Sequence, residues 1–170
     1  MSNNPPPDSA FDEVAAGSFS ANACTPVIDE FDVDYRGLKI HAPTRVQFPA
    51  GSETPRIVVC GTGVFDWNYM DLDGDFLEAI VIVAVNDQTH ESRSGRMQII
   101  ENRAMGPPVR EKLGLSKEDF KNRSIQKHFN PDIGALLELP ATPGSYTVYA
   151  TLGQYKSNVV QIRLETRSGN

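Results

Sequence analysis

The stretch that decides the fold is residues 146–152, which read Tyr-Thr-Val-Tyr-Ala-Thr-Leu. Apolar side chains fall on alternate positions from Tyr146 to Leu152, and the residues between them are two threonines and Tyr149. Successive side chains of a β-strand point to opposite faces, so this spacing predicts a strand with one face in a core and the other face toward water.

Short β-rich runs separated by Gly, Pro and Asp clusters surround this strand from Phe31 onward. Such spacing is typical of a β-sandwich or barrel. A chain of 170 residues is sized for one domain rather than two. We therefore expect a single, mainly β domain with strands near residues 38–41, 45–48, 57–65, 77–85, 97–100, 136–139, 146–152 and 158–164.

The run Ala79-Ile-Val-Ile-Val-Ala-Val85 differs from the others because it is apolar at every position. This pattern indicates either a central strand that is covered on both faces or a strand whose outer face meets a partner. Periodicity does not separate these two interpretations.

The carboxy-terminal segment carries a resemblance to a known family. Leu139-Pro-Ala-Thr-Pro-Gly144 places a corner rich in Pro and Gly before Tyr146, and Ser157-Asn-Val-Val160 leads into the last expected strand. This segment of about 26 residues resembles the last two strands of bacterial immunoglobulin-like and fibronectin-type-III-like domains. The resemblance implies an immunoglobulin-like antiparallel β-sandwich in which the Tyr146 hydroxyl bonds to upstream backbone, and it implies no activity.

The amino-terminal segment lacks the β pattern. Residues 1–30 contain Pro5-Pro6-Pro7 and no sustained apolar periodicity. A segment of this kind buries too little apolar surface to offset its ordering entropy. We expect a disordered tail there, ahead of a sandwich domain that spans residues 31–167.

Residues 102–131 are expected to form a short helical insertion before the last strands. Pro107-Pro108 opens a first helix that Gly114 ends. Ser116, with Asp119 three positions later, makes a start that resembles a capping box, and Asn130-Pro131-Asp132 ends the second helix.

The two cysteines and the first residues bear on the cellular compartment. Cys60 follows Ile-Val-Val in an expected strand, where a buried, reduced thiol is the favoured interpretation. The opening Met-Ser-Asn-Asn-Pro-Pro-Pro lacks the features of a secretory signal, so the sequence as written is expected to be cytoplasmic. A disulfide between Cys24 and Cys60 would instead mean export with a signal missing from this chain. No run of eighteen apolar residues is present, which predicts a soluble protein.

The net charge of −6 is unevenly distributed along the chain. Residues 1–92 carry 4 basic and 15 acidic side chains, whereas residues 93–128 carry 9 and 4. The second segment is a basic island, which is either an ordinary solvated face or a contact surface for acidic groups of this fold, another copy or a partner. The expected contact residues are Arg110, Lys112, Lys117, Lys121, Arg123 and Lys127, together with Trp67 and Tyr69.

Carboxylates crowd the segment around Gly74, at Asp71, Asp73, Asp75 and Glu78. Counted from Asp71, the Gly falls at the fourth position and Ile82 at the twelfth, so the segment fails the spacing of an EF-hand loop. An Asp-Gly hairpin turn is the favoured interpretation. The alternative is a calcium-dependent carbohydrate-binding module, with Trp67 and Tyr69 stacking on sugar rings. A hydrolase that uses these carboxylates is a less favoured alternative.

Catalytic motifs are weak throughout the sequence. His41, His90 and His128 are far apart, and Cys60-Gly-Thr-Gly63 lacks the lysine of a phosphate-binding loop. We expect no enzyme activity and no cofactor, and the acidic composition disfavours nucleic acid. The predicted function is a non-catalytic sandwich that binds a protein or self-associates, such as an inhibitor, an immunity-type protein or an accessory domain. Its contacts would use residues 102–131 and an exposed apolar strand face or edge.

Overall fold

The computed structural model describes residues 4–29, 32–98, 114 and 116–169. In chain order its elements are η1 (Asp8–Phe11), β1 (Gly37–His41), β2 (Arg45–Phe48), β3 (Cys60–Asp66), η2 (Tyr69–Asp71), η3 (Leu77–Ala79), β4 (Val81–Asn86), β5 (Ser92–Arg96), η4 (Lys117–Phe120), β6 (Ser124–Phe129), α2 (Ile133–Leu136), β7 (Gly144–Leu152), β8 (Tyr155–Lys156) and β9 (Val160–Thr166). None of the helices in these residues is long and apolar enough to cross a membrane.

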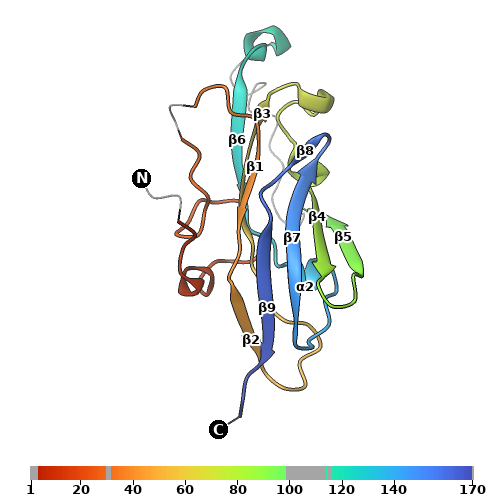
Figure 1. Cartoon of the computed structure of the whole chain (residues 1–170). Coiled ribbons are helices and arrows are strands. Elements are labelled where there is room, and N and C mark those ends of the chain that lie inside the picture. The colour runs from red at the N-terminus through yellow and green to blue at the C-terminus, as the bar shows by residue number, and fades with distance from the viewer. Residues whose placement is uncertain (1–3, 30–31, 99–113, 115, 170) are drawn as a thin grey trace.

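Two sheets form the body of the molecule (Figure 1). The smaller sheet has the order β1-β3-β6, and the larger has the order β2-β9-β7-β4-β5 with β8 attached to β7. All neighbouring pairs are antiparallel except β2 and β9, which are parallel. The predicted fold class, a mainly β sandwich, is confirmed.

The core lies between the sheets and follows the alternation that the sequence predicts. Along β7, Tyr146, Val148, Ala150 and Leu152 are all buried. On the smaller sheet, Gly61 and Gly63 make room for large rings, because a Cβ at Gly61 would lie 2.2 Å from the ring of Phe129. Each large apolar side chain that is fully buried contributes roughly 1.5–3 kcal/mol. The shape of β3 is therefore dictated by the aromatic side chains that it faces.

The segment around Gly74 is not a hairpin, which corrects the favoured interpretation. β3 belongs to the smaller sheet and β4 to the larger, so the connection crosses the end of the sandwich. It contains η2 and η3 and places the non-glycine residues Met70, Asp71 and Asp73 at positive φ. Its length and its short 3-10 turns come from the need to pass from one layer to the other.

Two expected strands are replaced by other elements. The strand expected at 136–139 is replaced by the end of α2 at Leu136 and by the turn after it, because the Asp132 carboxylate caps α2 by accepting hydrogen bonds from the backbone N–H groups of Gly134 and Ala135. The edge strand β5 covers Ser92–Arg96, so the strand expected at 97–100 is wrong for its described residues, 97 and 98.

The expected helical insertion is mostly a strand where the structure describes it. Its first predicted helix, at residues 107–113, lies outside the described residues. The predicted capping interaction is present, since the Asp119 carboxylate accepts hydrogen bonds from the backbone N–H and hydroxyl of Ser116, and these bonds lower the pKa of Asp119. The turn that follows is only η4, and Ser124–Phe129 then pairs with β3 as strand β6.

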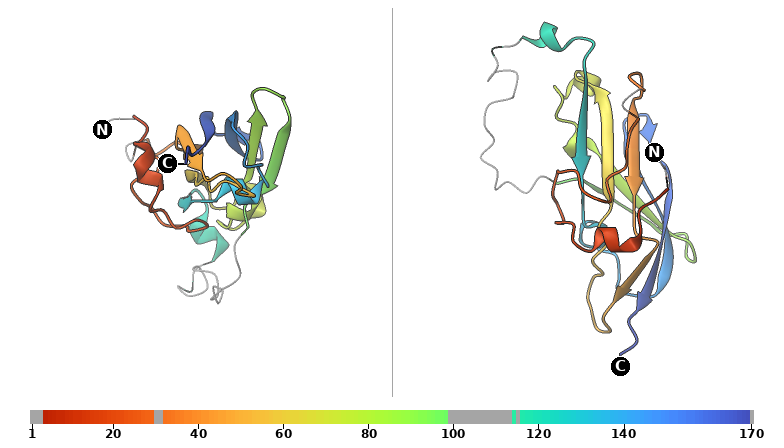
Figure 2. Two further views of the ribbon diagram at one scale, coloured as in Figure 1. Left: turned by 90° about the horizontal axis from the view of Figure 1, so that it is seen from below. Right: turned by 90° about the vertical axis from the view of Figure 1, so that its left-hand side faces the viewer.

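Residues 4–29, which we call the strap, differ from the disordered tail that the sequence predicts. They cross the outer side of the smaller sheet, on the side of the molecule opposite the β4–β5 hairpin (Figure 2). Phe11 and Val14 pack with Val58 in a second apolar cluster. The backbone of Ser18 pairs with that of Asn130. The strap contains few large apolar residues, and hydrogen bonds from its backbone and side chains also hold it against the smaller sheet.

A disulfide joins Cys24 of the strap to Cys60 of β3, with 5.8 Å between the Cα atoms. Both residues are fully buried in the second apolar cluster. The expectation of a reduced Cys60 is therefore wrong. The two cysteines are 36 positions apart, and they meet because the outward face of β3 lies under the strap.

Candidate functional site

Those predicted binding residues that the structure describes lie at one end of the sandwich. This end is built by the β3–β4 connection and by the segment that precedes β6. A cleft of about 360 Å³ is lined there by Arg36, Asp66, Trp67, Asn68 and residues 120–123. A smaller cleft beside it is lined by Asn68, Asp71, Asp73, Glu118 and Lys121.

Trp67 is a packing residue in this arrangement. Only 9% of its surface is exposed. Phe120 stacks on it with 4.2 Å between ring centroids, and Gly74 is so close that a Cβ there would lie 2.8 Å from Cζ3. The ring has too little free surface to stack on a sugar, so the geometry does not favour the carbohydrate-binding alternative.

Tyr69 is held in the same way by neighbouring aromatic side chains. Its ring stacks on Phe65 with 5.2 Å between centroids and meets Tyr155 edge-on at 5.4 Å. Its hydroxyl donates a hydrogen bond of 3.5 Å to the carbonyl oxygen of Leu152. Tyr69 therefore fixes the β3–β4 connection against β7 and β8.

The described basic residues at positions 121–127 of the island lie next to acids. Lys127 lies 3.5 Å from Asp75, and Lys121 lies 3.6 Å from Glu118. Arg123 contributes to lowering the pKa of Asp119. Arg110, Lys112 and the side chain of Lys117 lie outside the described residues. Of the interpretations left open for the island, neutralisation within the fold is the one that these contacts favour.

The alternative metal ligands are not brought together. Among the described residues, no group of three or more His, Cys, Asp or Glu side chains is close enough to hold a metal ion. Asp75 is paired with Lys127, and Lys121 shares the small cleft with Asp71 and Asp73. Glu78 does not line that cleft. Cys60 is oxidised, which removes it as a nucleophile.

The outer face of the larger sheet carries an apolar stripe, of which the sequence pattern indicates only the part on β4. Register pairs Val83 of β4 with Tyr149 of β7, and Val81 and Val85 with threonines of the same strand. These side chains are half-buried, while Ile82 and Ala84 on the opposite face of β4 are fully buried. No further layer covers this apolar stripe in the described part of the chain. Among the described residues, β4 is therefore a central strand that is fully buried on one face and half-buried on the other.

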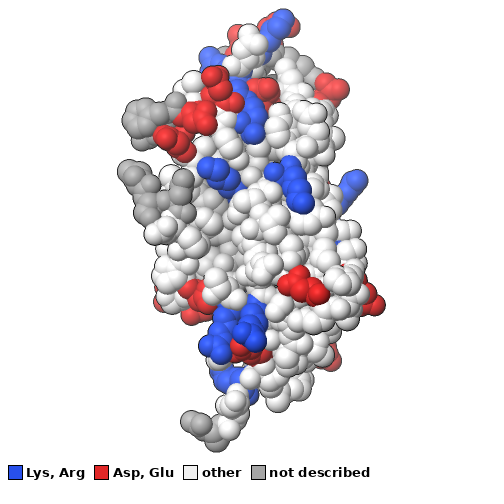
Figure 3. Space-filling view, in the orientation of Figure 1, with Lys and Arg blue, Asp and Glu red and all other residues white. Residues whose placement is uncertain are grey.

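Cations surround this stripe on the same face. Arg96 of β5 pairs with Val81, and Lys156 of β8 lies 4.0 Å from the centroid of the Tyr149 ring. Arg163 of β9 and Arg45 of β2 are register partners on the other side of the face. In Figure 3, blue side chains form a row across the middle of the molecule and a group lower down, and the surface between them is white except for a red patch beside the lower group. Side chains alternate between the two faces of each strand, so the sequence indicates which cations share a face within a strand. The sequence does not indicate which strands are neighbours, and that order is needed to bring these four cations together.

His128 and His41 hold the strap near the disulfide. The Thr62 hydroxyl donates to the carbonyl oxygen of Pro26 at 3.2 Å, so its oxygen is left to accept from Nδ1–H of His128 at 3.0 Å. Nδ1 of His41 lies 3.0 Å from the carbonyl oxygen of Cys24. Burial lowers the pKa of His128 below its usual value. Both histidines therefore have hydrogen-bond partners, and the hydroxyl that faces His128 belongs to the fully buried Thr62.

The folded protein is expected to lose stability as the pH falls through about 6.5, in part because of His128. Its lowered pKa means that the unfolded chain binds more protons in this range, and protons then favour unfolding. Urea unfolding of the wild type and of His128→Gln at pH 7.5 and pH 5 measures the effect. The variant should show a smaller fall in the free energy of unfolding, and equal falls would contradict this role for His128.

Comparisons with protein-family models, with curated proteins and with solved structures found no match to this chain.

Proposed function

We propose that this protein is a non-catalytic binding module that contacts a protein partner through the outer face of its larger sheet. The observation that carries this proposal is the apolar stripe of Val81, Val83 and Val85 with Tyr149 on a central strand pair. A stripe of partly exposed apolar side chains in the middle of a sheet face, with charged residues around it, is a common feature of protein interaction sites.

The charges around the stripe favour an acidic partner. Arg96, Lys156 and Arg163 are exposed on this face, and Arg45 joins them at its edge. The acids of the face are Glu165, which pairs with two of these arginines, and Asp87, which accepts a hydrogen bond from Thr147. The chain as a whole carries −6. Two copies would repel each other face to face, so a different, acidic protein suits this surface better than self-association through the same face.

The disulfide favours an oxidising compartment as the place of action. Disulfides persist in secreted or periplasmic proteins and are rare in the cytosol of most cells. The Cys24–Cys60 bond joins two segments of one small domain, as in many exported proteins. This replaces the cytoplasmic location expected from the sequence as the location that we propose.

The change Val83→Glu, at the centre of the stripe, is expected to weaken partner binding at least tenfold. Val83→Glu places a charge where the partner would bury it without a counterion, which costs at least tenfold in affinity. Gln126→Glu is the control, because it adds the same charge to an exposed position of β6 in the other sheet. The three proteins are used as bait in parallel on an extract of the source organism, and any captured protein is purified and its Kd measured.

The expected result is one captured protein whose Kd is unchanged for Gln126→Glu and raised at least tenfold for Val83→Glu. Equal melting temperatures would show that both variants are folded. A partner that binds Val83→Glu as well as the wild type would exclude this face as the contact surface.

A further inference from the structure

A cleft between the strap and the edge strand β2 has a lining that suits a negatively charged ligand. Its volume is about 430 Å³, within the range of small-molecule sites. Three arginines line it, one from each of three separate segments: Arg45 of β2, Arg56 ahead of β3 and Arg167 just after β9. We propose that this cleft binds a small organic anion through a carboxylate or phosphate group.

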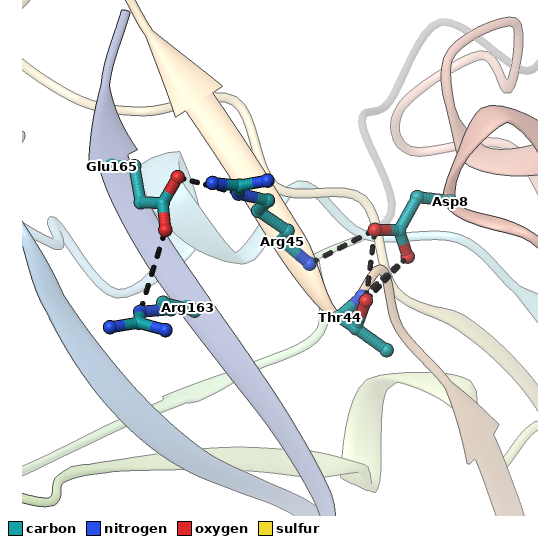
Figure 4. Close-up of polar contacts among 5 residues, drawn as sticks. All are labelled: Asp8, Thr44, Arg45, Arg163 and Glu165. Atoms are coloured by element: carbon teal, nitrogen blue, oxygen red, sulfur yellow. Dashed lines mark hydrogen bonds and ion pairs between the residues drawn. The ribbon is translucent and has the colours of Figure 1, made fainter.

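The three guanidinium groups differ in how far they are already engaged. Arg45 donates through Nε to Glu165 at 2.5 Å, and Glu165 also pairs with Arg163 at 3.4 Å (Figure 4). Arg56 donates one hydrogen bond to the carbonyl oxygen of Val14. No described side chain pairs with Arg167, whose backbone N–H bonds to Phe48. A guanidinium has five N–H donors, so all three retain donors for a ligand.

Two carboxylates also line the cleft, and they differ in their availability. Asp8 faces Thr44 and Arg45: its oxygens accept hydrogen bonds from both backbone N–H groups and from the Thr44 hydroxyl (Figure 4). These hydrogen bonds hold the Asp8 carboxylate against the start of β2, so its oxygens are not free to move into the cleft. Asp12 is exposed at the end of η1. The lining therefore carries three cations and two carboxylates, and Glu165 pairs with one of the cations, Arg45.

The chemistry of the lining restricts the class of ligand. Guanidinium groups bind carboxylate and phosphate oxygens with paired, planar hydrogen bonds, which a chloride ion does not exploit. Phe11, Val46, Val58 and Pro43 add apolar wall. An anion with a short carbon skeleton would use both parts of this lining.

Calorimetric titration with citrate and with inorganic phosphate, at ionic strength held constant with sodium chloride, tests the site. We expect saturable binding of at least one of the two anions to the wild type. Arg167→Gln should weaken it at least tenfold. Lys39→Gln is the control, since it removes one positive charge from β1 in the smaller sheet at a position that does not line the cleft, and its Kd should stay within about threefold.

Citrate binding without phosphate binding would indicate that the apolar wall contributes, and binding of both would indicate recognition of the anionic group alone. The proposal would be overturned if neither citrate nor phosphate bound saturably to the wild type. Equal weakening by Lys39→Gln and Arg167→Gln would also overturn it, because that would show only a general effect of charge. Val83→Glu should bind the anion like the wild type, which keeps this test separate from that of the sheet face.

Discussion

Replacing Cys24 and Cys60 together with serine is expected to lower the free energy of unfolding by about 4 kcal/mol. The disulfide closes a loop between positions 36 apart, and without it the unfolded chain regains the entropy that this closure removes. The native state also loses the only covalent link between the strap and β3 in the described part of the chain.

Guanidinium unfolding of the wild type and the double variant, each with and without dithiothreitol, measures this effect. The reductant should destabilise the wild type and leave the double variant unchanged, which provides the internal control. A broad-specificity protease should cut the strap of the variant faster than that of the oxidised wild type. Equal midpoints for the oxidised wild type and the variant would mean that the disulfide does not stabilise the fold.

Gly134→Ala is expected to cost about 3 kcal/mol of stability or to prevent folding. A Cβ at this position of α2 would lie 1.7 Å from the carbonyl oxygen of Pro55. Neither backbone moves freely, because Ile57 donates to the Asp132 carboxylate at 2.9 Å and accepts from the N–H of Ile133 at 2.8 Å. Relief of the overlap would break the hydrogen bonds that join α2 to the segment before β3.

The matched control for this variant is Gly144→Ala in β7. The nearest atom to a Cβ at that position, Oε1 of Gln88, lies at an ordinary contact distance of 3.5 Å. Its stability should stay within about 0.5 kcal/mol of the wild type. Thermal and urea unfolding of both variants would show the difference, and similar values for the two would mean that the close approach at Gly134 is not limiting.

The sequence predicts the strands of this fold best where apolar side chains alternate over several residues. Tyr146–Leu152 and Arg45–Phe48 are strands as expected, since alternation matches a sheet with one buried face. Ser124–Phe129 was missed because only Ile125 and Phe129 are large and apolar, and Lys127 extends over the ring of Phe76 at 5.9 Å. Lys127 is therefore a charged residue on the inner face of its strand, where the alternation pattern requires an apolar one.

The strap and the outer face of the larger sheet depend on contacts between distant segments, which a local sequence pattern does not predict. Asp8, Cys24 and Pro26 are held by Thr44, Cys60 and Thr62, partners that are 36 positions away in each case. The cations of the sheet face come from β2, β5, β8 and β9, so they form no run in the sequence. The basic island does form such a run, and the fold places its described lysines next to acids. A run of basic residues in this sequence therefore does not predict where a cationic surface forms on the fold.

The strap has a consequence for the order in which the chain matures as it is synthesised. Its residues leave the ribosome before the strands that they contact, and Ser18 can pair with Asn130 only after 112 further residues have been added. Cys24 needs only Cys60, so oxidation can tether the strap before the larger sheet exists. The disulfide can then form before β9 is added to the larger sheet. An early crosslink shortens the search for the distant pairing at Asn130, because loop closure over fewer free residues costs less entropy.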